Sequence, residues 1–200
     1  MKLSINGLSF SYEDKKIFEG LSLNLSSKKI SILIGRNGVG KSTLLRIIAG
    51  LEEQDQGKIT FTNNSSDQLQ IRGNISYLGH KLALKEDLSV QENINFWVKF
   101  YNCIPPYADH KELGIDGLRY QKIRDLSQGQ RKKVALLRIL MADKKIWLLD
   151  EPLSNLDEQA TNYFKNTLMA KVQDHKLILV TSHMRLNMKN ESCIYIGGKA

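Results

Sequence analysis

The sequence has few cysteines and no long apolar stretch. Its two cysteines, Cys103 and Cys193, lie far apart and form no CxxC pair, which gives no basis for a disulfide framework and favours a reducing cytosol. The N-terminus has no long apolar core of the kind that marks a signal peptide. The longest apolar stretches, Ile146–Leu149 and Leu177–Val180, fall far short of the ~20 residues that span a bilayer. Any membrane role must therefore act through a partner.

Long runs of one charge, internal repeats and low-complexity tracts are absent as well. The net charge is +8, but the longest run of cations is Arg131-Lys132-Lys133, so we expect mainly a solvated basic surface. Hydrophobic residues make up 42% and charged residues 25% of the chain, which is ordinary for a globular protein. At 200 residues the chain is long enough for one well-buried core. We expect one soluble, folded domain over residues 1–200.

The chain opens with a pattern that predicts an antiparallel hairpin. Apolar and polar residues alternate over Leu3–Phe10 and Ile17–Leu25, with the polar turn Glu13–Lys16 between them. A nearly continuous apolar run, Ile30–Ile34, then predicts a strand that is buried on both faces.

Beyond this point, strands alternate with helices, which implies a parallel sheet. Apolar spacing predicts helices over Lys41–Ala49, Glu92–Tyr101, Gln128–Met141 and about Glu158–Val172. Strand patterns cover Lys58–Phe61, Asn74–Leu78, Ile146–Leu149, Leu177–Thr181 and Cys193–Ile196, with a polar loop over Thr62–Asp67. We expect the hairpin and the last strand to add antiparallel pieces at the edges of the sheet. Residues of about 84–141 should form a small helical lobe inserted in the α/β core.

A phosphate-binding loop follows the first buried strand. Residues Gly35–Ser42 match G-x-x-x-x-G-K-[ST], and they lie between a strand and a helix, which is the context that confirms the pattern. Glycines let successive N–H groups point at phosphate oxygens, and the helix N-terminus adds its positive dipole end. Lys41 would place a cation on the β and γ phosphates of ATP, and Ser42 would offer its hydroxyl to Mg²⁺. The predicted nucleotide-binding residues are Gly35, Arg36, Asn37, Gly38, Val39, Gly40, Lys41, Ser42 and Thr43. The fold class is therefore α/β: a P-loop NTPase with a mixed-sheet, RecA-like core, an antiparallel β subdomain and a small inserted helical subdomain.

Two carboxylates, Asp150 and Glu151, end the second buried strand, which is where ligands bind in open α/β sheets. Asp150 would hold Mg²⁺, directly or through water. Glu151 would point differently and could polarise the attacking water as a general base. An acidic pair of this kind also occurs in solvated turns, but here it follows a phosphate loop and becomes the second half of one predicted site.

The residues Leu126-Ser127-Gln128-Gly129-Gln130 open the helix before that strand and resemble the signature motif of ATP-binding cassette ATPases, usually Leu-Ser-Gly-Gly-Gln. Ser127, the Gly129 amide and the helix N-terminus would make a second anion site, and the motif match adds Gln130. The resemblance covers nearly the whole chain. It implies a head-to-tail homodimer in which the signature of one subunit closes on the nucleotide at the phosphate loop of the other. Gln128 replaces the usual glycine.

Further positions match the family in order. The resemblance places Tyr12 where an aromatic ring stacks on adenine, and Ser154–Asp157 in the loop that links the two ATP sites. It places His183 at the switch position that senses the γ-phosphate and orients Glu151. Taken singly, Tyr12 is also explained as a half-buried strand aromatic, and His183 as a packed or surface imidazole.

One position departs from the family pattern. His80 follows the strand Asn74–Leu78, where the family normally carries a Gln that reaches Mg²⁺ and the attacking water. Imidazole can still contact the metal or its water, so His80 joins Glu151 and His183 as a predicted catalytic residue, and Ser42 and Asp150 as a predicted metal ligand. Because imidazole changes its protonation near neutral pH, we predict that ATPase activity falls below about pH 6.5 more than in Gln-bearing relatives.

The short chain and the residues Tyr77–His80, Leu84-Lys85, Leu88-Ser89 and Glu92-Asn93 resemble the ATP-binding subunits of bacterial cytochrome c maturation systems, often described as haem exporters. This implies partners that are two small integral membrane proteins, and a peripheral location on the cytoplasmic face of the inner membrane. It also implies haem delivery for c-type cytochrome assembly, either by moving haem or, as we favour, by releasing a haem-bearing chaperone. The alternative within the class is the ATPase subunit of another small exporter.

Two other classes fit the sequence less well. A soluble cassette protein that acts on ribosomes or DNA usually has two cassettes or a long coiled-coil insertion, and this sequence has neither. A P-loop kinase or GTPase lacks the motif at Leu126–Gln130. We therefore expect no nucleic-acid partner. The aromatic residues Phe96, Trp97 and Phe100 lie at helical spacing, and they form either the surface for the membrane partner or packing inside the lobe.

Overall fold

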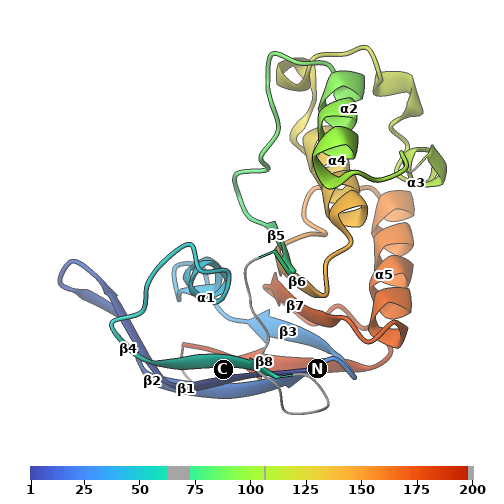
Figure 1. Cartoon of the computed structure of the whole chain (residues 1–200). Coiled ribbons are helices and arrows are strands. Elements are labelled where there is room, and N and C mark those ends of the chain that lie inside the picture. The colour runs from blue at the N-terminus through green and yellow to red at the C-terminus, as the bar shows by residue number, and fades with distance from the viewer. Residues whose placement is uncertain (63–72, 106, 198–200) are drawn as a thin grey trace. The chain divides into compact units, whose positions relative to one another are not determined.

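The computed structural model describes residues 1–62, 73–105 and 107–197 (Figure 1). The chain separates into two compact units. The first contains residues 1–77, 144–150 and 168–200, and the second contains residues 78–143 and 151–167. The segment predicted as an inserted lobe lies in the second unit. Most of the predicted polar loop, residues 63–67, lies outside the described residues.

The first unit contains an antiparallel sheet with the strand order β2-β1-β4. Its strands are β1 (Lys2–Tyr12), β2 (Lys15–Ser26) and β4 (Gln56–Thr62). The predicted hairpin is confirmed, with Leu3 paired to Leu25 and Phe10 paired to Phe18. These strands form a sheet of their own, so the prediction that the hairpin extends the edge of the parallel sheet is wrong. The residues that alternate inward from β1 are almost fully buried, and they join this sheet to the core.

The second sheet of this unit has the order β5-β6-β7-β3-β8. Its strands are β3 (Ile30–Ile34), β5 (Ile75–Leu78), β6 (Ile146–Asp150), β7 (Leu177–Ser182) and β8 (Glu191–Tyr195). The pairs β3–β7 and β6–β7 are parallel, as predicted from the alternation of strands and helices. Every residue of β3 and β6 is buried, which is why these strands read as continuous apolar runs.

The last strand, β8, was predicted to be antiparallel, and this is wrong. It pairs parallel to β3, with Ile32 opposite Cys193. A parallel neighbour needs a return connection, which usually takes a dozen residues or more. Here residues 183–190 make the return. An extended chain spans about 3.3–3.6 Å per residue, so a segment of this length can reach back to the start of β8. The Ile30 N–H then donates to the Asn190 carbonyl at 3.0 Å and fixes the start of the strand.

Helix α1 (Lys41–Ile48) packs its apolar face into the same core. Leu44, Leu45, Ile47 and Ile48 are all buried, as the helical spacing predicted. The helix ends where Gly50 adopts a φ of 70°. A positive φ costs glycine little, so Gly50 can close the helix, and its N–H donates to the Ile47 carbonyl at 3.0 Å.

The second unit is helical. It contains α2 (Val90–Tyr101), α3 (Tyr107–Glu112), α4 (Gln128–Ala142) and the first turns of α5 (Glu158–Gln173), with 3-10 turns at Asp116–Leu118 and Ile123–Asp125. Capping boxes start α2 and α4, which explains why Ser89 and Ser127 begin these helices. The short α3 and the 3-10 turns were not predicted. Over the described ranges, no helix is long and apolar enough to cross a membrane.

The aromatic residues of α2 stack along one side of the helix. Trp97 lies 5.5 Å from Tyr101 in a stacked arrangement, and it meets Phe96 and Phe100 edge to face. The Arg138 guanidinium of α4 lies 5.5 Å from the Trp97 ring centroid, so the half-buried Trp97 packs against α4. Phe100, in contrast, is 67% exposed. Phe100 therefore remains a predicted contact for the membrane partner, whereas Trp97 takes part in packing.

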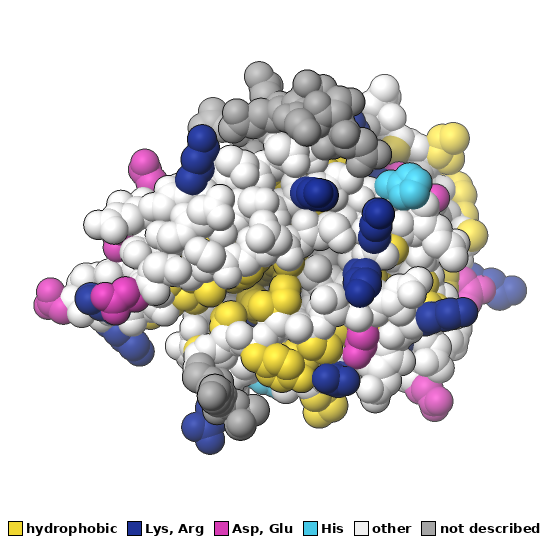
Figure 2. All heavy atoms as spheres, turned by 90° about the horizontal axis from the view of Figure 1, so that it is seen from below, with side chains coloured by type: hydrophobic (Ala, Val, Ile, Leu, Met, Phe, Trp, Pro, Cys, Tyr) yellow, Lys and Arg dark blue, Asp and Glu magenta, His cyan; other side chains and the backbone are white. Residues whose placement is uncertain are grey.

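The prediction that the basic residues form a mainly solvated surface is only partly confirmed. Figure 2 shows one face of the molecule on which Lys and Arg side chains are scattered, some of them beside Asp and Glu side chains. The longest cationic run differs, because Lys132 and Lys133 are 7% and 9% exposed. For these two residues the prediction of a solvated surface is wrong. Both lie on α4 and bond to residues of the segment 151–157.

Candidate nucleotide-binding site

The first unit gathers several predicted site residues at the carboxyl ends of its parallel strands. β7 lies between β3 and β6, and their registers set Ile34 opposite Ser182 and Asp150 opposite Thr181. Neighbouring strands lie about 4.8 Å apart, so the phosphate loop after β3 and Asp150 at the end of β6 are two strand spacings apart. This edge is where open α/β sheets bind ligands.

The phosphate loop, residues 35–40, owes its shape to its glycines. Gly38 and Gly40 have φ values of 77° and 102°, in a region that other residues rarely adopt. A Cβ on Gly35 would lie 2.8 Å from the Ile196 carbonyl oxygen, and one on Gly40 would lie 2.6 Å from Ile17 Cγ2. Residues 36–38 are exposed, so the turn of the loop is accessible to a ligand.

Lys41 is held against the backbone of this loop. It is the first residue of α1 and 5% exposed, and its Nζ donates to the carbonyl oxygens of Gly35 at 2.7 Å and Arg36 at 3.2 Å. The ammonium group is thus fixed at the loop, at the N-terminal end of a helix. The arrangement concentrates positive charge where an anion would bind.

Asp150 is 1% exposed and accepts a hydrogen bond from Thr181 Oγ1 at 2.6 Å. This bond orients one carboxylate oxygen across the β6–β7 pair. Burial, followed by the nearby charge of Asp150, raises the pKa of the Tyr77 hydroxyl above its usual value.

Tyr12 ends β1 and is 39% exposed, so part of its ring is open to a ligand. Its hydroxyl donates to Glu52 Oε1 at 3.3 Å, and the same carboxylate pairs with Arg46 of α1. Phe10 meets the Tyr12 ring edge to face at 4.8 Å. These contacts fix the ring relative to the helix that follows the phosphate loop.

The second unit carries the signature residues at the start of α4. Ser127 Oγ accepts from the Gln130 N–H at 3.2 Å, and the Gln130 side chain accepts from the Ser127 N–H at 2.9 Å. Ser127 is exposed at the helix N-terminus, where the dipole favours an anion. A Cβ on Gly129 would overlap the Asn155 carbonyl oxygen. Glycine is therefore needed here for the close approach of α4 to the segment 151–157.

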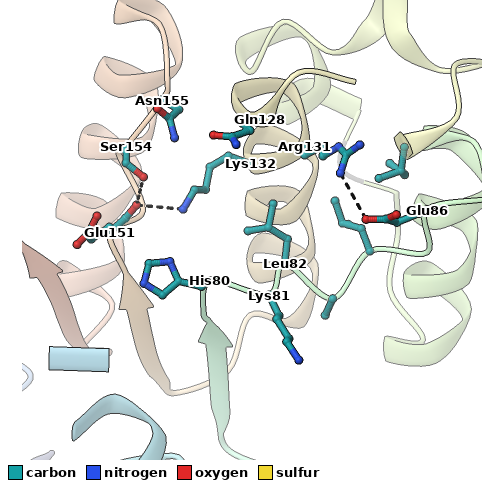
Figure 3. Close-up of a pocket in the computed structure, with 13 residues that line it drawn as sticks. His80, Lys81, Leu82, Glu86, Gln128, Arg131, Lys132, Glu151, Ser154 and Asn155 are labelled. Carbon is teal, nitrogen blue, oxygen red and sulfur yellow. Dashed lines mark hydrogen bonds and ion pairs between the residues drawn. The ribbon is translucent and has the colours of Figure 1, made fainter. Parts of the chain in front are cut away.

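A groove of about 780 Å³ in the second unit brings His80 and Glu151 together (Figure 3). Its lining also includes Gln128 and Lys132 of α4 and Asn155. Glu151 has a φ of 45°, and a proline follows it. A left-handed conformation is strained for a residue other than glycine, and it is further disfavoured before proline. Strain of this kind is concentrated at functional sites.

The predicted site residues thus fall into two groups. The first unit contains Tyr12, residues 35–43, Asp150 and His183. His183 lies exposed directly after β7. The second unit contains His80, Ser127, Gly129, Gln130 and Glu151. The boundary between the units passes between Asp150 and Glu151.

Sequence reasoning missed Lys132, whose Nζ donates to the Glu151 carbonyl at 3.1 Å. The only signal for it in the sequence was its place in the cationic run after the signature motif.

Comparison with known proteins agrees with this geometry. The model of the family described as ABC transporter matches residues 18–154, which include the phosphate loop, the signature residues and both carboxylates. The chain belongs to the ABC transporter family. It is therefore an ATP-binding subunit of the ABC type, and its enzymatic activity is ATP hydrolysis.

The chain also has full-length relatives within this family. It is 33% identical to a Rhizobium etli protein named cytochrome c biogenesis ATP-binding export protein CcmA, over 100% of this chain and 96% of that one. Proteins of the same name from Bartonella henselae and Rickettsia felis are 34% and 31% identical, over 94% and 97% of this chain and 91% and 99% of theirs.

Solved structures confirm the predicted fold class. A putative ABC transporter ATP-binding protein from Pyrococcus furiosus has a TM-score of 0.77 at 23% identity, over 96% of this chain and 97% of that one. The ATP-binding cassette MJ0796, in a dimeric post-hydrolysis state bound to ADP and Pi, has a TM-score of 0.75 at 23% identity, over 97% of this chain and 94% of that one. The ABC family thus has the combination of parallel core, separate antiparallel sheet and helical segment found here.

Proposed function

We propose that residues 1–200 act as one nucleotide-binding domain, with the helical lobe of about 84–141 inserted in it, and that the phosphate loop holds the triphosphate of ATP. Lys41 supports this role, because its ammonium is already fixed at the loop carbonyls beside the start of α1. The loop amides over residues 35–43 would bind the phosphate oxygens, and the Tyr12 ring would stack on adenine.

The first unit also suits Mg²⁺. The Ser42 hydroxyl and the Asp150 carboxylate are hard oxygen ligands of the kind that Mg²⁺ prefers. Within the described residues there is no cluster of three or more His, Cys, Asp or Glu side chains. That fits an ion held by one or two protein groups and by phosphate oxygens. When bound, Mg²⁺ would neutralise charge that develops on the phosphates.

Glu151 is the proposed general base. It lies half-buried in a groove that His80 shares, and its strained backbone fixes the direction of the side chain. In this proposal Glu151 would take a proton from the attacking water, His80 would contact that water or the metal, and His183 would sense the γ-phosphate.

Two variants test these roles. Lys41→Ala should abolish ATP binding, measured by equilibrium binding of a fluorescent ATP analogue to the purified chain. Glu151→Gln should keep ATP binding and lose turnover by at least ~10²-fold, which is the lower range for removal of a general base. Normal turnover in Glu151→Gln would remove Glu151 from the catalytic role.

We further propose that two chains bind ATP head to tail as a homodimer. The support is that one chain has two phosphate-binding devices, the loop ending at Lys41 and the N-terminus of α4 at Ser127. The dimeric state named for MJ0796 fits this arrangement. Ser127, Gly129 and Gln130 of one subunit would contact the triphosphate bound by the other.

The process is proposed to be haem delivery for c-type cytochrome biogenesis. The observation that carries this proposal is the full-length similarity to proteins named for cytochrome c biogenesis export. The chain would bind two integral membrane proteins of the cytochrome c maturation system, peripherally on the cytoplasmic face of the inner membrane. ATP hydrolysis would serve to release a haem-bearing chaperone. The alternative is the ATPase subunit of another small exporter.

Genetic complementation separates the two processes. A strain that lacks this gene should lose covalent haem from its c-type cytochromes while it keeps b-type haem, as measured by haem staining and spectroscopy. The wild-type gene should restore covalent haem, and Lys41→Ala should not. Normal c-type cytochromes in the deletion strain would exclude haem delivery and favour another exporter.

A further inference from the structure

The segment that begins with Glu151 is tied to α4 at three points. Gly129 leaves room for the Asn155 carbonyl, Lys133 pairs with Asp157, and Lys132 reaches Glu151. The hydrogen bond from the Lys133 ammonium is the main reason that the pKa of Asp157 lies below its usual value. Of these contacts, only that of Lys132 is made to the residue proposed as the general base.

Three donors converge on the carbonyl oxygen of Glu151. They are Lys132 Nζ at 3.1 Å, Ser154 Oγ at 2.9 Å and the Ser154 N–H at 3.2 Å. The first comes from α4, and the other two come from the turn after Glu151 itself. Figure 3 shows the Lys132 and Ser154 side chains pointing at this oxygen from different elements.

The convergence has a physical consequence because Glu151 is strained. Its φ of 45° before a proline is a conformation that the chain leaves unless surrounding contacts hold it. A hydrogen bond from a charged, nearly buried ammonium is stronger than one from a neutral group. Lys132 therefore holds the peptide plane from which the Glu151 side chain projects.

We propose that Lys132 is a positioning residue for ATP hydrolysis, acting through the backbone carbonyl of Glu151. The inference rests on the proposed role of Glu151 as general base. Lys132 lies one turn after the signature residues on the same helix. A shift of α4 when Ser127 and Gly129 bind phosphate would thus reach Glu151 of the same subunit.

Steady-state ATPase kinetics of the purified full chain test this role. Lys132→Met keeps the length of the side chain and removes its donor, so kcat should fall about tenfold, which corresponds to ~1.4 kcal/mol, while KM stays within about twofold. Lys132→Arg keeps a charged donor and should recover most of kcat. Lys111→Met is the matched control, since it makes the same change at an exposed lysine of α3 that does not line the groove, and it should leave kcat unchanged.

A double variant separates a failure of this inference from a failure of the proposed function. In a Glu151→Gln background, Lys132→Met should reduce kcat no further, because both changes act on one group. An undiminished kcat in Lys132→Met, or a full additional loss in the double variant, would overturn the positioning role. Normal turnover in Glu151→Gln alone would instead overturn the proposed function. If Lys132→Met does not fold by circular dichroism, Lys132→Gln takes its place with the same expected loss.

Discussion

Replacing Gly40 by alanine should destabilise the chain without any involvement of nucleotide. Two terms contribute. At a φ of 102°, alanine is strained, by ~1–2 kcal/mol on the scale of left-handed conformations. The new Cβ would also lie 2.6 Å from Ile17 Cγ2 and 2.7 Å from Phe18 Cζ. Ordinary carbon contacts are ~3.5–4.0 Å, so the Ile17 and Phe18 side chains, or β2 with them, must move by about 1 Å. Overpacking of this kind costs ~1–3 kcal/mol.

The matched control lies two residues earlier. Gly38 also has a positive φ, 77°, but a Cβ there would meet nothing within 4 Å. Gly38→Ala should therefore show the strain alone, ~1–2 kcal/mol, whereas Gly40→Ala should lose about 3 kcal/mol in total. For a chain of this size, 1 kcal/mol shifts Tm by ~2–4 °C. The expected fall in Tm is then about 9 °C for Gly40→Ala and about 4 °C for Gly38→Ala.

Urea and thermal unfolding of the nucleotide-free chain, followed by tryptophan fluorescence, provide the measurement. Trp147 is fully buried in β6 of the same unit as the loop, so its emission reports on this core. Equal destabilisation of the two variants would refute the reasoning, because the packing of Gly40 against Ile17 and Phe18 would then contribute nothing.

Two other predictions concern the helical unit. His110 is 0% exposed, and burial holds the pKa of its imidazole below the usual 6.5. As the pH falls through 6.5, the unfolded chain therefore binds a proton that the folded chain does not, and the free energy of unfolding should fall from pH 7.5 to 5.5. His110→Leu should make the Tm less dependent on pH over this range. Profiles of Tm against pH that run parallel in the wild type and the variant would contradict this prediction. Phe100→Ala should abolish co-purification with a membrane subunit while ATP binding persists, since Phe100 is exposed and Trp97 packs against Arg138. Retained co-purification would show that Phe100 does not contact the membrane subunit.

Local sequence patterns predicted most of the elements, because periodicity and capping act over a few residues. The buried strands β3, β6 and β7 and the helices α1, α2 and α4 lie within two residues of their predicted bounds. Ser127, which was predicted to begin α4, is its N-cap, and the structure adds that it forms a capping box with Gln130. In each case the residues that specify the element are its own.

Features that depend on distant partners could not be predicted in the same way. The direction of β8 depends on its pairing with β3, which lies more than 150 residues earlier in the chain. The burial of Lys132 depends on the Glu151 carbonyl, since a lysine on a helix is exposed unless a partner is brought to it. The strain at Glu151 likewise follows from the turn that ends β6.

Sedimentation velocity of the Glu151→Gln chain with saturating Mg-ATP tests the central proposal most directly. A species of twice the monomer mass of 22.8 kDa is predicted, and Ser127→Arg in the same background should return it to a monomer that still binds ATP. A Glu151→Gln chain that stays monomeric at saturating Mg-ATP, alone and with its membrane partners, would contradict the account.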